Sequence, residues 1–154
     1  MNSVIEKELK QNGMVAVRTD GDSMRPLLRH HRDVVVIERV PPGERLKKYE
    51  IALYRRNPEG PFTLHRILRV QKQDYVICGD NRWRRESGIT DVQILGRLTE
   101  IRRGNRTVSV TSMGYRCYTH LWCDLFYLRA AILFFRDLPR NGKKLWKRMT
   151  GKKC

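Results

Sequence analysis

The sequence GDSMRP at residues 21–26 lies between two apolar runs, MVAV at 14–17 and DVVVI at 33–37. Apolar, β-branched runs are typical of strands, whereas Gly, Asp, Ser and Pro each favour turns. This stretch therefore predicts two strands joined by a turn that carries Ser23. Two interpretations of Ser23 follow: it is an ordinary turn residue, or it is a nucleophile held on a rigid turn, which needs a base from elsewhere in the chain.

Apolar runs separated by turn signals continue on the C-terminal side of this turn. We expect strands at about 14–19, 33–39, 50–56, 62–70, 74–78, 92–102 and 107–111, with Gly104-Asn105 as a hairpin turn. A short helix is expected at 3–11, because Asn12-Gly13 ends a helical pattern there. The expected fold is mainly β, a compact antiparallel body with a short N-terminal helix and a C-terminal amphipathic helical tail.

The charge of the chain is strongly basic and unevenly distributed. Its 154 residues carry a formal net charge of +16. Residues 1–112 hold 22 Lys/Arg and 14 Asp/Glu, whereas residues 113–154 hold 10 and 2. We therefore divide the chain into a β-domain, 1–112, and a basic tail, 113–154. The density of basic residues in the tail predicts an anionic partner, either phospholipid head groups or nucleic acid.

The tail has helical periodicity from Tyr115 to Leu138. Asp124 and Arg129 interrupt its apolar run, which is too short for a membrane-spanning helix. One interpretation is an amphipathic helix at an anionic membrane surface, formed by residues 115–154; the other is a helix packed on the β-domain with a solvated basic end. The apolar residues at helical spacing are Leu121, Leu125, Leu128, Ile132 and Phe135. The basic residues assigned to one face, or to the segment after Pro139, are Arg129, Arg136, Arg140, Lys143, Lys144, Lys147 and Arg148.

The N-terminus predicts where the protein is located, and the cysteines predict whether it has disulfides or a metal site. Residues 1–11 are charged and lack an apolar segment, so we expect no signal peptide and no N-terminal transmembrane anchor. We expect a cytoplasmic or peripherally membrane-associated protein. The cysteines show neither a CxxC pair nor metal-ligand spacing with the histidines, which argues against a disulfide framework and predicts no metal and no cofactor. They are Cys78, Cys117, Cys123 and Cys154.

Four histidines are candidates for the base that Ser23 would need. His30 and His31 lie in the basic loop RHHR at 29–32, and His120 opens the C-terminal helix, so all three are expected to be exposed. His65 lies within the strand pattern FTLHRILRV at 62–70. A lone histidine on a strand is commonly structural, so His65 needs further support before it is assigned a chemical role.

That support comes from five short motifs in a fixed order: GxSMxP at 21–26, RDVV at 32–35, LHRI at 64–67, GDN at 79–81 and GR at 96–97. With these motifs, about residues 13–103 resemble the type I signal peptidase and LexA-type serine peptidase superfamily. The resemblance implies a compact, largely antiparallel β-fold with a serine nucleophile on the turn after its first strand. Ser23 matches that nucleophile.

The resemblance also implies the base and its partner. His65 lies where bacterial leader peptidases have a lysine and where the endoplasmic-reticulum and archaeal type has a histidine. A histidine, with an ordinary pKa near ~6.5, needs only orientation and a carboxylate to stabilise its imidazolium. Asp80, in the acidic box, is the first choice for that carboxylate. Glu86 and Asp91 are the alternatives, because the further Asp pair of the His-type members is replaced here by Arg85-Glu86.

The function implied is that of a stand-alone serine endopeptidase. It would remove a leader or signal segment from a precursor peptide through an acyl-enzyme, with small residues before the cut. We expect no N-terminal anchor, unlike in secretory signal peptidases, and no DNA-binding domain before Ser23, unlike in LexA repressors. The Ala-Gly dipeptide at which those repressors cleave themselves does not occur in the sequence. The alternatives are a catalytically inactive peptide-binding β-domain, acting as scaffold or chaperone, and a basic nucleic-acid-binding protein. No nucleic-acid motif is present, so no nucleic-acid partner is expected.

Overall fold

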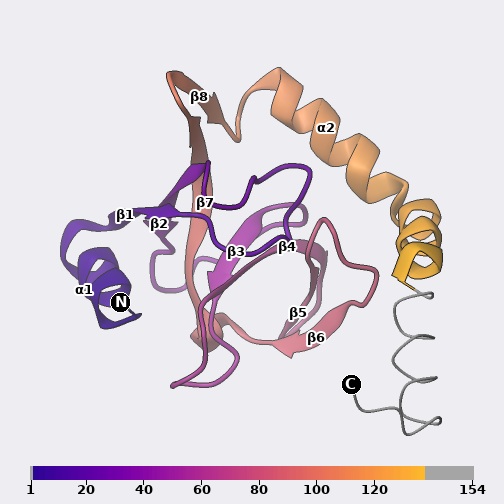
Figure 1. The fold of residues 1–154 in the computed structure, drawn as a ribbon. Helices are drawn as coiled ribbons and strands as arrows, with labels where there is room; N and C mark the ends of the chain where they lie inside the picture. Colours follow the sequence, from indigo (N-terminus) through magenta and orange to yellow (C-terminus); the bar gives the residue numbers. More distant parts are fainter. Residues whose placement is uncertain (1, 138–154) are drawn as a thin grey trace, which may run out of the picture.

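The computed structural model describes residues 2–137, and its core is one eight-stranded antiparallel sheet (Figure 1). The expectation of a mainly β, antiparallel fold is therefore confirmed. The strands are β1 (Met14–Arg18), β2 (Val34–Arg39), β3 (Ile51–Tyr54), β4 (Thr63–Val70), β5 (Tyr75–Cys78), β6 (Glu86–Ile89), β7 (Ile94–Arg103) and β8 (Arg106–Ser109). The helices are α1 (Asn2–Asn12), the short 3-10 helix η1 (Asp91–Gln93) and α2 (Met113–Asp124).

The strand order is β1-β2-β7-β3-β4-β5-β6, with β8 beside β7. β7 returns late in the chain to pair with both β2 and β3, so it connects the two halves of the sheet. A Cβ on Gly96 of β7 would lie 2.6 Å from Glu38 O and 2.6 Å from Ile37 Cγ2. A side chain at this position would collide with β2, so a glycine is required where β7 joins it.

Two clusters of buried apolar side chains hold the sheet together. The first joins α1, β1, β2, β7 and part of β3, and the second lies under β3, β4, β5 and β6. The loop after β1 is anchored in the first cluster by Met24 and Leu28, which are 5% and 4% exposed. The turn that carries Ser23 is therefore fixed from beneath by its own apolar residues.

One strand, β6, was not expected, because the sequence predicts no strand between residues 78 and 92. Its residues, ESGI at 86–89, show neither an apolar run nor a clear alternation. β6 forms because it pairs with β5, with Ile89 opposite Tyr75 and Glu86 opposite Ile77. Ile89 is fully buried in the second cluster and anchors the strand.

The C-terminal segment is helical, as expected, but it is not one continuous helix. α2 begins after Ser112, whose side chain accepts a hydrogen bond from Tyr115 N, and the helix ends at Asp124. Residues 126–137 are again helical. No helix within residues 2–137 is long and apolar enough to cross a membrane.

Arg129, which the sequence places on one basic face with Arg136 and Arg140, is buried. The residue is 8% exposed, and its guanidinium lies over the rings of Trp122 and Phe126, at 5.2 and 5.0 Å. Arg136 is exposed. The other basic residues of the expected face and of the segment after it, Arg140, Lys143, Lys144, Lys147 and Arg148, lie outside the described residues.

Candidate active site

The sheet brings His65 of β4 to Glu86 of β6 through the strand between them. Glu86 lies opposite Ile77 of β5, and Ile77 lies opposite Ile67 of β4. Because alternate residues of a strand share a face, Ile67 and His65 point to the same side of the sheet. Glu86 is thereby directed toward His65, and His65 Nδ1 lies 3.1 Å from Glu86 Oε1.

Two neighbours complete this group from the β3 side. Tyr54 lies two residues after Ala52, which is directly opposite His65, so its ring shares the face of the imidazole. Its hydroxyl is 3.3 Å from His65 Nδ1 and donates to Glu86 Oε2 at 3.1 Å. Arg56 Nη2 donates to the same Oε2 at 3.0 Å. Both oxygens of Glu86 are therefore occupied, one by His65 and one by Tyr54 and Arg56.

The charge state of Glu86 follows from these contacts. The hydrogen bond with His65, reinforced by Arg56 and opposed by burial, lowers the pKa of Glu86 to about 2. Glu86 is thus a carboxylate at neutral pH and can only accept hydrogen bonds. Burial and the neighbouring Glu86 raise the pKa of Tyr54 well above its ordinary value, so its hydroxyl remains a donor.

These facts assign the tautomer of His65. An ionised Glu86 accepts from His65 Nδ1, so Nδ1 carries the hydrogen. In the neutral imidazole the other nitrogen, Nε2, then holds the free lone pair. The His65 side chain is 9% exposed, and Glu86 and Tyr54 set the orientation of its ring. A buried, oriented imidazole with a free Nε2 has the form of a general base.

Nε2 of His65 points to the loop after β5, where Gly79 lies. A Cβ on Gly79 would be 3.0 Å from His65 Nε2 and 2.6 Å from the backbone oxygen of Ser23. His65 Nε2 and the backbone oxygen of Ser23 therefore both lie against the position that a Gly79 side chain would occupy, and this space admits no side chain. Ser23 and His65 are far apart in the sequence but adjacent here.

The loop after β5 also binds the serine loop directly. Asn81 N donates to Ser23 O at 2.7 Å, and Asn81 Nδ2 donates to Asp22 O at 3.2 Å. Arg82 Nη2 forms an ion pair with Asp22 Oδ1 at 2.7 Å. Within the described residues the Ser23 hydroxyl makes no hydrogen bond, and Ser23 is half-buried. Its backbone is fixed while its hydroxyl is free to act.

Asp80, expected first as the partner of His65, contacts Arg66 instead. Arg66 lies opposite Cys78, and Asp80 follows two residues later, so both carboxylate and guanidinium lie on the face away from His65. Arg66 Nε and Nη2 donate to Asp80 at 2.9 and 2.8 Å, and both residues are at most 1% exposed. Burial alone would lower the pKa of Arg66, but the Asp80 carboxylate raises it above its ordinary value.

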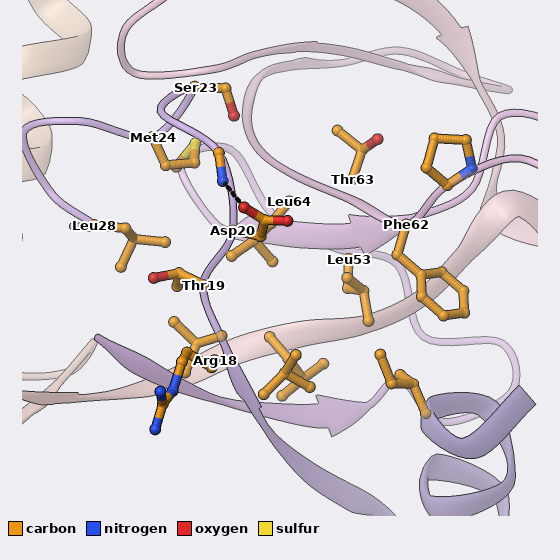
Figure 2. A pocket seen from close by; sticks show the side chains of 16 residues that line it. Arg18, Thr19, Asp20, Ser23, Met24, Leu28, Leu53, Phe62, Thr63 and Leu64 are labelled. Atoms are coloured by element: carbon orange, nitrogen blue, oxygen red, sulfur yellow. Dashed lines mark hydrogen bonds between the residues drawn. The ribbon is translucent and has the colours of Figure 1, made fainter. Parts of the chain in front are cut away.

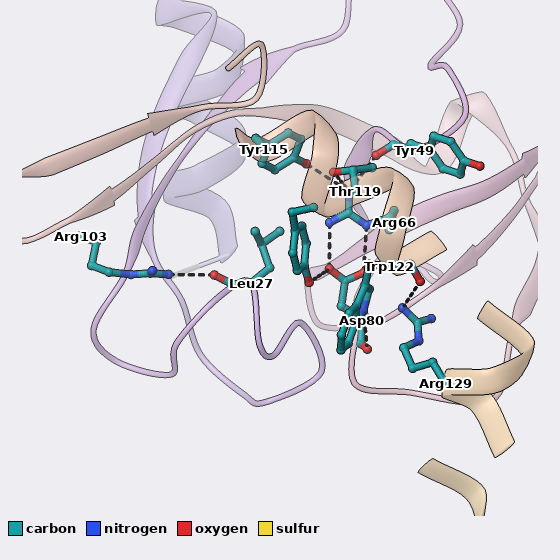
Figure 3. A network of polar contacts seen from close by, with 10 residues as sticks. Leu27, Tyr49, Arg66, Asp80, Arg103, Tyr115, Thr119, Trp122 and Arg129 are labelled. Atoms are coloured by element: carbon teal, nitrogen blue, oxygen red, sulfur yellow. Dashed lines mark hydrogen bonds and ion pairs between the residues drawn. The ribbon is translucent and has the colours of Figure 1, made fainter. Parts of the chain in front are cut away.

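The Arg66–Asp80 pair is enclosed by α2 (Figure 3). Tyr118 OH donates to Asp80 Oδ2 at 3.2 Å, and Trp122 Nε1 donates to Asp80 O at 3.1 Å. Arg66 Nη1 donates to Tyr115 OH at 3.1 Å. The pair therefore fixes the loop that carries Gly79 and ties α2 to the sheet, and it does not touch the imidazole.

The remaining candidates lie away from His65. Asp91, on η1, is 3.1 Å from Arg45 Nε and accepts from Tyr75 OH. His120 is exposed on α2, 3.5 Å from Asp124 Oδ2. Of the three acids that the sequence proposes, Glu86 is the one in contact with His65.

His30 and His31 are close to the serine loop but turned to solvent. Gly21 N donates to His30 Nδ1 at 2.8 Å and to Asp20 Oδ1 at 2.7 Å. Ligand atoms of Asp20, His30 and His31 lie within 4.8 Å of one another, and all three residues are exposed. This arrangement closes the turn before Ser23, and neither histidine hydrogen-bonds to Ser23 within the described residues.

An apolar pocket of about 390 Å³ opens beside Ser23. Figure 2 shows Ser23 at one edge of this pocket, with Phe62 and Thr63 across from it and Leu28 and Leu53 in its lining. It is bounded by the serine loop, by the segment that enters β4, and by side chains of the first core cluster. The candidate site therefore combines a serine, a base and an apolar cavity.

Sequence reasoning missed Tyr54 and Arg56. Their signal is weak, because a tyrosine that ends a buried run and a nearby arginine are ordinary in strands. Cys78, Cys117 and Cys123 form no disulfide with one another within residues 2–137, and burial raises the pKa of Cys78 to about 12. Comparisons with protein-family models, curated proteins and solved structures find no match.

Proposed function

We propose that the protein is a serine endopeptidase of the signal-peptidase and LexA-type superfamily. Ser23 is the nucleophile, His65 the general base and Glu86 the carboxylate that orients it. The substrate is a precursor peptide or protein, from which a leader or signal segment is removed. The motif order along residues 13–103 and the antiparallel sheet both support this class.

The observation that carries the proposal is the position of His65 between two partners. Its Nδ1 is held 3.1 Å from the Glu86 carboxylate, and its Nε2 lies beside Gly79, where the backbone oxygen of Ser23 also lies. A serine hydroxyl becomes a nucleophile only when a base can take its proton. The hydrogen bond to Glu86 leaves the correct nitrogen of His65 free to do so.

The reaction then proceeds in two halves. His65 Nε2 takes the proton of Ser23 Oγ, which attacks the scissile carbonyl, and the imidazolium is stabilised by Glu86. The backbone N–H groups of Ser23 and Met24 donate to no other described residue and are available to the oxyanion. His65 returns the proton to the leaving amine. Water then attacks the acyl-enzyme, again with His65 as base, and frees Ser23.

The apolar pocket supports a peptide substrate. Its lining is mainly aliphatic and aromatic, which suits an apolar side chain next to the scissile bond. The family resemblance adds a preference for small residues before the cut. Together they favour a leader segment with apolar and small residues near its end.

The proposal is tested by incubating the protein with a proteome-derived peptide library and mapping new termini by mass spectrometry. We expect cleavage at a consistent sequence by the wild type, and none by Ser23→Ala or His65→Ala. Matched controls are Ser109→Ala, on β8, and His120→Ala, exposed on α2. Cleavage that survives Ser23→Ala would refute the mechanism.

A second candidate is a peptide-binding domain without catalysis. It is favoured by the Ser23 hydroxyl, which makes no hydrogen bond to His65 within the described residues, although catalytic hydrogen bonds often tighten only with substrate. The apolar pocket alone suffices for binding. Peptides retained uncleaved, with equal affinity, by wild type and Ser23→Ala would identify this function.

A further inference from the structure

The helical segment after the sheet has an apolar stripe that faces solvent. Its residues recur at spacings of four and three, from Leu121 on α2 across the break at Leu125 to the helical residues 126–137. Exposed fractions are 64% for Leu121, 60% for Leu128 and 66% for Phe135. The full stripe is Leu121, Leu125, Leu128, Ile132 and Phe135. Exposed apolar side chains that recur in this way mark an interaction surface.

The opposite side of the same segment is already packed. Tyr115, Cys123, Phe126 and Leu133 are each at most 8% exposed. The ring of Phe134 lies edge-on against Trp83 at 5.2 Å, in the loop between β5 and β6. The helix is therefore attached to the protein by its inner face, and the apolar stripe is not needed to hold it there.

The charge around the stripe selects its partner. Residues 113–137 carry 3 Lys/Arg and 2 Asp/Glu, and Arg116 and Arg136 are exposed on the helical segment. The sequence that follows, residues 138–154, adds 7 Lys/Arg and no Asp/Glu. A second copy would bring the same positive charge to the interface and repel it. A nucleic acid would match the charge but would leave the aliphatic side chains in water. A membrane with anionic head groups matches both features at once.

We propose that residues 113–137 dock on membranes that contain anionic phospholipids. The stripe inserts at the boundary between head groups and acyl chains, and the positive charge of the C-terminal part of the chain, residues 113–154, attracts the anionic head groups. The helix lies along the surface and does not cross it. This binding is independent of peptidase activity.

The test is co-sedimentation of the full-length protein with vesicles. We expect binding to vesicles of equal parts phosphatidylcholine and phosphatidylglycerol, and little binding to phosphatidylcholine alone. Leu128→Asp should weaken binding about tenfold or more, because one large apolar contact is lost and a negative charge is added. The control Val92→Asp alters an equally apolar residue on η1 that is 93% exposed and should bind as the wild type does.

The thermal midpoint of each variant is measured first, and because Leu128 is 60% exposed it should be unchanged. If Leu128→Asp does not fold, a double variant with Leu121→Ser and Ile132→Ser takes its place. We expect the same loss of vesicle binding from it. The proposal would be overturned if Leu128→Asp, or the double variant, bound anionic vesicles as well as the wild type does. Equal binding of the wild type to both kinds of vesicle would also overturn it. Binding of duplex DNA at physiological salt, with no binding to vesicles, would identify a nucleic acid as the partner instead.

Discussion

At the scale of single residues, the proposed chemistry depends on the contact between His65 and Glu86. The carboxylate holds the hydrogen on Nδ1 and leaves Nε2 free toward the serine loop. A neutral amide at position 86 keeps the shape of the side chain but can donate as well as accept, and it no longer fixes this tautomer. The role of Glu86 is therefore separable from its packing.

Glu86→Gln should lower kcat for peptide cleavage by about 100- to 10,000-fold, with a small effect on KM. The loss arises because the imidazolium is less stabilised and the wrong tautomer is populated. Steady-state kinetics on a peptide selected from the library measures it. The control Asp91→Asn removes a carboxylate that does not touch His65 and should keep kcat near the wild-type value.

The lowered pKa of Glu86 also predicts how stability depends on pH. Its value of about 2 lies below the ordinary 4.5, so the ionised group stabilises the folded state above about pH 4.5, and this contribution is lost as pH falls toward 2. The side chain is 33% exposed, so solvent screens the effect and only the pH window is predicted. In urea unfolding, the free energy of unfolding of the wild type should exceed that of Glu86→Gln above about pH 4.5, and this difference should shrink as the pH falls toward 2. A difference in free energy of unfolding that stays constant across this pH range would contradict the lowered pKa of Glu86.

At the scale of elements, the candidate site depends on β6 and on the loop before it. The turn with Ser23, the strand with His65 and the GDN segment could be predicted, because each has local turn or strand chemistry. β6 could not, because ESGI has no apolar pattern and forms only by pairing with β5. The choice between Asp80 and Glu86 likewise depends on register, which places Arg66 opposite Cys78 and so directs Asp80 to the other face.

The Arg66–Asp80 pair is the strongest link between β4, the GDN loop and α2. Asp80→Asn should destabilise the protein by about 3–5 kcal/mol, because it leaves the buried Arg66 charge without a counter-ion. The free energy of unfolding in urea measures this. Asp124→Asn, at an exposed carboxylate on α2, serves as control and should change stability far less.

At the scale of the whole molecule, the sheet and the C-terminal helix are one structure where they meet. Tyr115 belongs to the first core cluster, and Tyr118 and Trp122 bond to Asp80. The division at residue 112 follows the change of composition, and the contacts of α2 cross it. Charge and apolar periodicity could predict an amphipathic helix, but not that Arg129 is buried, because that depends on the rings beside it.

Truncation after residue 112 tests whether the sheet depends on α2 for its stability. The shortened chain should have a markedly lower thermal midpoint than the full chain, because Arg66 and Asp80 lose their cover and the first cluster loses Tyr115. Circular dichroism melts of both chains measure the difference. An unchanged midpoint would mean that residues 1–112 form a self-sufficient domain.

The central claim, that Ser23 forms a covalent acyl-enzyme with His65 as its base, is tested most directly by trapping that intermediate. The protein is mixed with an activated ester of a peptide from the library, quenched in acid, digested and sequenced by tandem mass spectrometry. We predict an acyl group on Ser23 in the wild type and in Ser109→Ala, and none in His65→Ala. Peptide cleavage with no adduct on Ser23, or with an adduct that persists in His65→Ala, would contradict the account.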